Sequence, residues 1–126
     1  MIMNKMKVLL PIKPIYANKI LDWEKLFELR KSIPKDKIDT VVIYSSSPEK
    51  KIIWEFSVDW IICEDLNKLW NIVKDKACVS KRFYDEYFEW KTKWYAIKVK
   101  DPIRYKKNLP ITVYTKTPPQ GFMYIN

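Results

Sequence analysis

The residues best suited to chemistry lie in one short stretch, where Glu28 and Arg30 are two positions apart and Lys25 precedes them. Residues two apart in a strand share a face, so Glu28 and Arg30 can pair with each other or with one polar ligand. Lys13 and Lys31 lie nearby in the sequence. A carboxylate among several cations suits an anion or the polar edge of a nucleobase. From spacing alone, a solvated ion pair of little energetic consequence is the simpler interpretation.

A helix and a strand are expected to position this stretch. Pro14 suits the first position of a helix, because its missing N–H would have no partner there. The free N–H groups of this helix end point outward, where an anion can bind them. The pattern then changes to period two over residues 26–30. Lys25 and Glu28 are three apart, so they share a pocket only if the turn before the strand, or a bulge, redirects Lys25.

The composition excludes several kinds of catalytic site. The chain has 126 residues and no histidine, which removes Ser-His and Cys-His mechanisms and histidine-bound zinc. Cys63 and Cys78 do not have a metal-binding spacing and need not pair. We therefore expect no metal and no cofactor. Any catalysis would use Lys, Glu, Asp, Tyr, Cys or backbone groups.

The charge favours an acidic partner. The formal net charge is +9, which is typical of proteins that bind nucleic acid. Almost all basic residues are lysines, however, and a chain rich in Lys and Ile is also what an A/T-rich genome encodes. The charge thus permits RNA or DNA binding without requiring it. The absence of a membrane-length apolar run and of a leader predicts a cytoplasmic protein with one domain, residues 1–126, and leaves its oligomeric state open.

The rest of the chain predicts an α+β fold. Alternating apolar residues indicate strands at 6–12, 38–44, 52–62 and 93–100, and a last edge strand at 109–113. Turns are expected at 45–48 and at 101–102. Asp65 and Ser80 are suited to cap two helices, and the second helix carries an aromatic stripe that we assign to the core: Phe83, Tyr84, Tyr87 and Phe88. Five to six strands with two to three short helices fit a small, partly open β-barrel.

The residues from Leu10 to Pro34 resemble the ASCH domain (activating signal cointegrator homology), a family of the PUA-like superfamily. The motifs that carry the resemblance are Ile12-Lys13-Pro14, Tyr16-Ala17, Glu24-Lys25 and Glu28-Leu29-Arg30-Lys31. Further pieces follow in the family's order, up to Pro118-Pro119-Gln120. The resemblance covers nearly the whole chain and implies a barrel with a cleft that receives a nucleobase, often in RNA. It implies that the cleft is lined by Lys13, Lys25, Glu28, Arg30, Tyr44, Ser45, Ser46 and Gln120.

Three functions fit the sequence, and we favour the first over the other two. The first is a module that binds RNA, another nucleic acid or a nucleotide-like ligand in a cleft lined by Lys25, Glu28 and Arg30. The second is a small hydrolase acting on a modified nucleoside or RNA, because some ASCH proteins resemble amidohydrolases that use a Lys and a Thr spaced as Lys25 and Glu28 are here. Glu28 is a poor substitute for a hydroxyl nucleophile, although a carboxylate can activate water. The third is a protein-interaction domain, which an exposed patch including Trp60 or Trp90 would favour.

The chain departs from the family in its glycines. It has one glycine and six tryptophans. ASCH sequences usually have glycine where Trp23 stands, often have it where Trp54 stands, and favour small residues around Trp90 and Trp94. We hypothesise that these tryptophans stand for glycine in the natural protein, as would follow if a UGA codon that the organism reads as glycine were translated as tryptophan.

Overall fold

The structure is a computed structural model that describes residues 6–34, 37–91 and 94–125. Its elements follow in the order β1 (Lys7–Ile12), α1 (Pro14–Leu21), β2 (Phe27–Arg30), β3 (Thr40–Ser45), β4 (Lys51–Cys63), α2 (Leu66–Val73), α3 (Lys81–Tyr87), β5 (Tyr95–Leu109), the 3-10 helix η1 (Ile111–Val113) and β6 (Met123–Ile125). Within the described ranges, six strands form one sheet in the order β2-β5-β4-β3-β1-β6.

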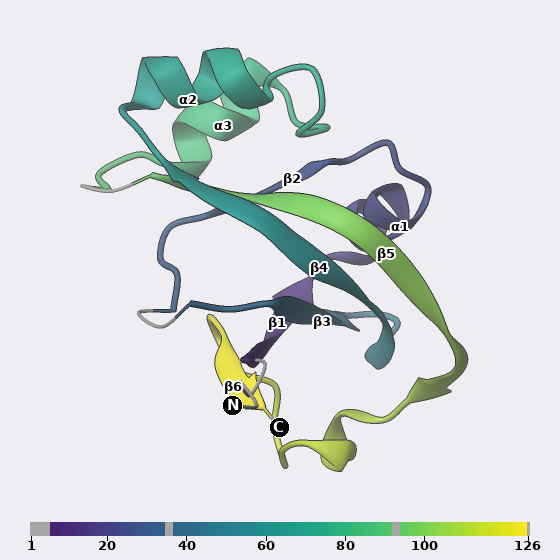
Figure 1. Ribbon diagram of the computed structural model, residues 1–126. Coiled ribbons are helices and arrows are strands. Elements are labelled where there is room, and N and C mark those ends of the chain that lie inside the picture. Colours follow the sequence, from purple (N-terminus) through teal and green to yellow (C-terminus); the bar gives the residue numbers. More distant parts are fainter. Residues whose placement is uncertain (1–5, 35–36, 92–93, 126) are drawn as a thin grey trace, which may run out of the picture.

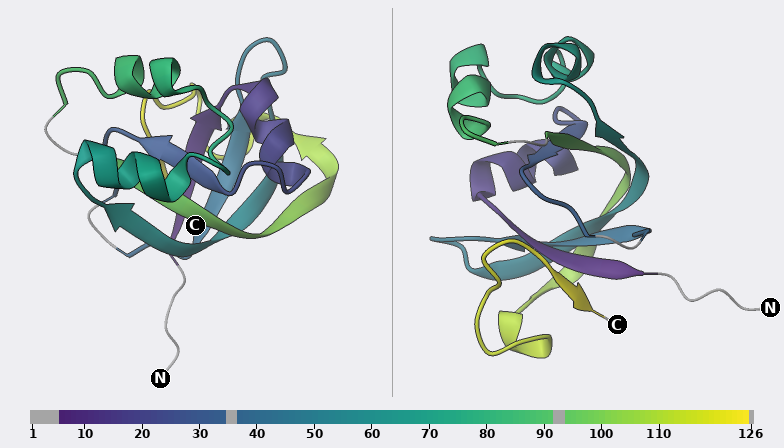
Figure 2. Two further views of the ribbon diagram at one scale, coloured as in Figure 1. Left: turned by 90° about the horizontal axis from the view of Figure 1, so that it is seen from above. Right: turned by 90° about the vertical axis from the view of Figure 1, so that its left-hand side faces the viewer.

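The sheet curves without closing, and helices cover its two ends (Figure 1). Strands β1 and β3 are parallel, whereas β3–β4 and β4–β5 are antiparallel. Helices α2 and α3 lie beside β2 at one end, and η1 and β6 lie at the other (Figures 1 and 2). The predicted α+β, partly open barrel is therefore confirmed. The turn predicted at residues 45–48 is also present, and it joins β3 and β4 as a hairpin.

The alternation of apolar residues explains how the core forms. Val8 and Leu10 of β1 pack inside the barrel with α1, while Leu9 on the opposite face packs toward β6. A further cluster lies under α2 and α3, where Leu69 and Tyr84 are fully buried. These clusters fix the positions of α1, β2 and α3 relative to one another. None of the helices in the described part of the chain is long and apolar enough to cross a membrane.

Two predicted boundaries are wrong. The turn expected at 101–102 is absent, because β5 continues through Asp101 and Pro102 to Leu109. Between its pairs with β4 the register shifts, so these residues form an irregularity within the strand instead of a turn. Proline is tolerated there because the pairing of β5 with β2 ends at Lys98, which leaves the following residues on an edge.

The second error concerns the edge strand predicted at 109–113. Leu109 belongs to β5, and Ile111–Val113 form a 3-10 helix instead. The last strand is β6, which pairs with β1. Proline at position 110 has no N–H to give to a ladder, and the chain turns away from the sheet at that residue. The predicted strand at 93–100 corresponds to the start of β5, although residue 93 lies outside the described residues.

Candidate functional site

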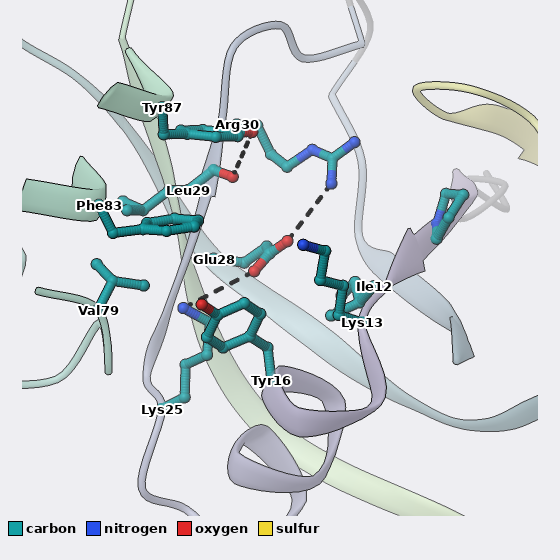
Figure 3. Close-up of a pocket in the computed structure, with 11 residues that line it drawn as sticks. Ile12, Lys13, Tyr16, Lys25, Glu28, Leu29, Arg30, Val79, Phe83 and Tyr87 are labelled. Atoms are coloured by element: carbon teal, nitrogen blue, oxygen red, sulfur yellow. Dashed lines mark hydrogen bonds and ion pairs between the residues drawn. The ribbon is translucent and has the colours of Figure 1, made fainter. Parts of the chain in front are cut away.

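A hollow of about 310 Å³ lies between α1, β2 and α3. This volume falls at the lower end of the range typical of small-molecule sites. Four charged side chains line it, and three aromatic side chains form much of the remaining wall: Lys13, Lys25, Glu28, Arg30, Tyr16, Phe83 and Tyr87. In Figure 3, Glu28 projects into the middle of this group, with Lys25, Lys13 and Arg30 around it. We call this hollow the cleft.

Helix α1 ends in a tight turn that directs Lys25 into the cleft. The carbonyl of Lys19 accepts the backbone N–H groups of Glu24, at 2.9 Å, and of Lys25, at 3.0 Å. Trp23 takes the left-handed conformation that closes this turn, with φ of 64°. Lys25 therefore precedes β2 instead of following its pleat, and it shares the cleft with Glu28. The redirection that the three-residue spacing requires is thus supplied by the turn.

Lys25 is the most deeply buried charge of the cleft, at 2% exposure. Its Nζ donates a hydrogen bond to the carbonyl of Ala77. The same atom lies 3.9 Å from Oε1 of Glu28 and 5.2 Å from the ring centroid of Tyr16. Burial lowers the pKa of Lys25, while the carboxylate of Glu28 opposes that shift. Lys25 therefore loses its proton at a lower pH than an ordinary lysine does.

Glu28 and Arg30 lie on the cleft face of β2, as the period of two predicts, whereas Phe27 and Leu29 pack under α2 and α3. The guanidinium of Arg30 lies 3.4 Å from Oε2 of Glu28. It also donates a hydrogen bond of 3.0 Å to the carbonyl of Gly121. Glu28 is thus held between two cations, and Arg30 joins β2 to the C-terminal segment.

The aromatic wall was missed by the sequence analysis, which assigned the whole stripe of α3 to the core. Tyr84 and Phe88 do face the core, at 0% and 2% exposure. Phe83 and Tyr87 face the cleft, and their rings stack at 5.9 Å between centroids with 10° between planes. Four aromatics at this spacing form an ordinary apolar helix face, so the sequence carries no signal that separates Phe83 and Tyr87 from the core pair.

Four of the predicted residues lie outside the cleft. Tyr44 and Ser46 line a second hollow, which shares Pro11 and Lys13 with the cleft. Ser45 is fully buried, and its hydroxyl has no hydrogen-bond partner in the described part of the chain. Gln120 is exposed and lines neither hollow; the neighbouring Gly121 contacts the site instead, through its carbonyl. The structure thus brings together Lys13, Lys25, Glu28 and Arg30 only.

The charge of the cleft favours a ligand that is anionic but offers hydrogen-bond donors. Three cationic side chains surround one carboxylate, which leaves a formal excess of two positive charges. Glu28 can accept hydrogen bonds, for example from the amino or imino groups of a base. Lys13 is exposed at the rim, where it can contact a phosphate. Among residues 6–34, 37–91 and 94–125, no group of three or more Cys, Asp or Glu side chains is placed to hold a metal ion.

Sequence comparison finds relatives of more than one kind. No protein-family model matches the chain. The chain is 30% identical over 105 residues to the large ribosomal subunit protein uL22 of Ureaplasma parvum, covering 82% of this chain and 34% of that protein. It therefore spans about a third of the length of that relative. It is 29% identical over 104 residues to an ASCH domain-containing ribonuclease of Zymomonas mobilis, covering 80% of this chain and 70% of that protein.

Solved structures agree with this similarity. A crystal structure of a serine-to-alanine variant of the ASCH protein from Zymomonas mobilis superposes with a TM-score of 0.88 at 24% identity. The match covers 99% of this chain and 92% of the other. The crystal structure of the unsubstituted protein gives a TM-score of 0.84 at 25% identity, over 95% and 87% of the two chains. The solved structures therefore show that this chain has the fold of the ASCH protein from Zymomonas mobilis.

Proposed function

We propose that this chain is a member of the ASCH-domain family that binds RNA, and that its cleft receives a nucleobase. The observation that carries the proposal is the position of Glu28. The residue is nearly buried, at 7% exposure, and its carboxylate lies between Lys25 and Arg30 in a largely apolar hollow. A ligand for this cleft must offer hydrogen-bond donors to the carboxylate and negative charge to the cations. A nucleotide offers both, because its base carries N–H groups and its phosphate is an anion.

The walls of the cleft suit the parts of a nucleotide. Phe83 and Tyr87 present stacked rings, and proteins that bind single-stranded RNA hold unpaired bases against aromatic side chains. Glu28 would accept hydrogen bonds from the base edge. Lys13 at the exposed rim would contact phosphate, while the buried Lys25 would hold Glu28 in place. A membership of the wider PUA-like superfamily and a cytoplasmic location stay predictions.

The test is a calorimetric titration of the purified chain with nucleoside monophosphates and with short single-stranded RNAs. The Glu28→Gln variant keeps the shape of the side chain and removes its charge. We expect it to weaken binding by about tenfold to a hundredfold, the value of a hydrogen bond to a charged group. Glu24→Gln is the matched control, because Glu24 is exposed and lies outside the cleft.

A second pair of variants separates the cleft from the basic surface. Arg30→Gln should weaken binding, whereas Arg82→Gln should not, because Arg82 is exposed and paired with Glu86 away from the cleft. Equal effects of both, with binding abolished by moderate salt, would indicate a nonspecific basic surface. No binding of any nucleotide or RNA would overturn the proposal and favour the protein-interaction alternative.

A second candidate function is the cleavage of RNA. It is favoured by the carboxylate of Glu28 among Lys13, Lys25 and Arg30, and by the relative that is named a ribonuclease. Glu28 would take the proton of a ribose 2′-hydroxyl, whose oxygen attacks the adjacent phosphorus. The bond from phosphorus to the 5′-oxygen then breaks, and that oxygen takes a proton from water or a cationic side chain. The cations would stabilise the charge on the phosphate.

Cleavage is tested separately from binding. Labelled single-stranded RNA is incubated with the chain in the presence of a chelator, and the products are resolved by length. The proposal requires a 2′,3′-cyclic phosphate product, loss of cleavage in Glu28→Gln, and no cleavage of the same sequence as DNA, which lacks the 2′-hydroxyl. Tight binding with intact RNA would leave the chain as a binding domain only.

A further inference from the structure

We propose that the second hollow is a subsite for the neighbouring nucleotide of the same RNA strand, so that the chain recognises a dinucleotide step. This inference rests on the proposed function of the cleft. The second hollow lies between the start of α1 and the loop from β3 to β4, with a volume of about 780 Å³. That volume is sufficient for a nucleoside.

The two hollows adjoin each other at Lys13. This residue immediately precedes α1 and lines both of them, together with Pro11. Lys13 is exposed and has an extended backbone, with φ of −61° and ψ of 142°. An ammonium on the ridge between two nucleoside-sized hollows is placed to contact the phosphodiester that joins their occupants. A strand with one base in the cleft would therefore continue past Lys13.

The charge and polarity of the second hollow match the next nucleotide. Lys50 adds a second cation, and the described lining includes no acidic residue. Ser46 and Ser47 offer hydroxyls, which are suited to hydrogen bonds with ribose or phosphate oxygens. The remaining lining is largely apolar and suits the flat face of a sugar or base. A phosphate between Lys13 and Lys50 would meet two positive charges and no opposing carboxylate.

The test compares nucleoside monophosphates with dinucleoside monophosphates by calorimetry. For the unsubstituted chain, the dinucleotide should bind about tenfold more tightly, because a second base and a phosphate contact are added. Lys50→Gln should remove most of this preference. Lys51→Gln is the matched control: it removes the same charge from the next residue, which is exposed and lies outside both hollows. Backbone amides of Ser46 and Lys50 should shift in NMR spectra with the dinucleotide and not with the mononucleotide.

The outcomes separate the two proposals. If mononucleotides bind and dinucleotides bind no better, or if Lys50→Gln keeps the preference in full, the subsite is wrong and the cleft stands. If neither ligand binds the unsubstituted chain, the proposed function itself fails. An equal loss in Lys50→Gln and Lys51→Gln would show a general effect of charge and would also overturn the subsite.

A different set of observations carries a second inference: we infer that Trp23 and Trp90 occupy positions built for glycine. A chain of 126 residues ordinarily contains about nine glycines, whereas this one contains one. Both tryptophans have a backbone conformation that glycine would adopt without strain. Neither lines a hollow, so the inference is independent of the proposed function.

Trp23 stands at the glycine position of a helix-ending motif. After α1, the N–H of Trp23 donates to the carbonyl of Ile20, at 3.1 Å, and the N–H of Glu24 donates to that of Lys19, at 2.9 Å. These two bonds define the Schellman motif, in which the residue at this position is usually glycine because it is left-handed. Trp23 has φ of 64° and is 54% exposed, so packing does not hold it there.

After α3, Trp90 has the same combination of a left-handed backbone and an exposed aromatic side chain. Its φ is 65°, and 91% of its surface is exposed. Lys50, Cys78 and Asp101 also have positive φ, so the conformation alone does not identify a glycine. A bulky aromatic residue at positive φ is a stronger outlier than these three residues, however. The exposed side chains of Trp23 and Trp90 bury too little surface to offset that backbone strain.

The remaining tryptophans do not share this conflict. Trp54 is fully buried in the barrel core, where glycine would leave a cavity, and Trp94 packs against the cluster under α2 and α3. The hypothesis therefore does not extend to these two residues. The other two tryptophans also make packing contacts. Trp70 packs on Tyr84, with 4.9 Å between ring centroids, and Trp60 lies 5.3 Å from the ammonium of Lys98.

The coding DNA and the mass of the protein isolated from its own organism test this inference. We expect UGA at codons 23 and 90, and peptides that contain glycine at these positions. UGG at these codons would overturn it. Independently, Trp23→Gly and Trp90→Gly should each raise the Tm of the chain as given by about 3–6 °C, by relieving left-handed strain. Trp70→Gly, the control, should lower it, and a lowered Tm in both test variants would also contradict the inference.

Discussion

The Nζ atom of Lys25 and the Oε1 atom of Glu28 lie 3.9 Å apart, although β2 begins between the two residues, at Phe27. The turn after α1 brings them together, and the cleft keeps both nearly free of water. A buried ammonium depends strongly on its partners, because burial disfavours its charged form. Four predictions follow from this arrangement and from the walls around it.

Replacement of Glu28 by glutamine should lower the pKa of Lys25 further. Burial already lowers that pKa, and the carboxylate of Glu28 is the strongest influence that raises it. The titration can be followed by NMR of isotope-labelled lysine side chains. Glu24→Gln removes an exposed carboxylate one residue from Lys25 and should leave the titration almost unchanged. An unchanged pKa in Glu28→Gln would show that the two groups are not coupled.

The stability of the chain should depend on pH through Lys25. The pKa of Lys25 is lower in the folded chain than its ordinary value of 10.5, so the unfolded chain holds this proton more tightly. Stability therefore rises with pH between the folded-state pKa and 10.5, by about 1.4 kcal/mol per unit of difference. The Lys25→Met variant lacks this rise. Urea unfolding of both proteins from pH 7 upward should show the unsubstituted chain gaining stability relative to the variant.

Variants of the aromatic wall should affect ligand affinity and folding stability separately. Phe83→Ala removes a ring that faces the cleft, so RNA or nucleotide binding should weaken by the equivalent of about 1–3 kcal/mol. Tyr87→Phe keeps the ring but loses the hydrogen bond of 3.1 Å to the carbonyl of Leu29, so it should cost about 1 kcal/mol of stability and little affinity. Calorimetric titration and urea unfolding of each variant give the two quantities. Equal affinity in Phe83→Ala and the unsubstituted chain would remove the stacking role.

Arg30 should hold the C-terminal segment as well as Glu28. Its hydrogen bond to the carbonyl of Gly121 is one of the links between β2 and this segment. Arg30→Ala should therefore accelerate hydrogen exchange in residues 115–122, as measured by mass spectrometry. Arg82→Ala breaks only an exposed ion pair with Glu86 and serves as the control. Unchanged exchange in Arg30→Ala would show that the segment is held by other contacts.

The sequence predicts most elements of this fold because their patterns are local. Alternation identifies β1, β3 and β4, and Asp65 and Ser80 cap α2 and α3 as expected, each accepting a backbone N–H with its side chain. The prediction at Pro102 was wrong because a strand tolerates proline where no neighbouring strand needs its N–H. Strand β2 is too short to pair with that part of β5. No local signal reports the length of a partner strand.

The sequence by itself determined which chemistry is available and part of its placement. It supplied no histidine, and it put Glu28 and Arg30 on one strand face by the period of two. Only the tertiary structure decided that Lys25 joins them, that Phe83 and Tyr87 face the cleft, and that Tyr44 and Ser46 line a different hollow. The physical reason is that periodicity fixes which side chains share a face, whereas packing against distant elements decides what that face meets.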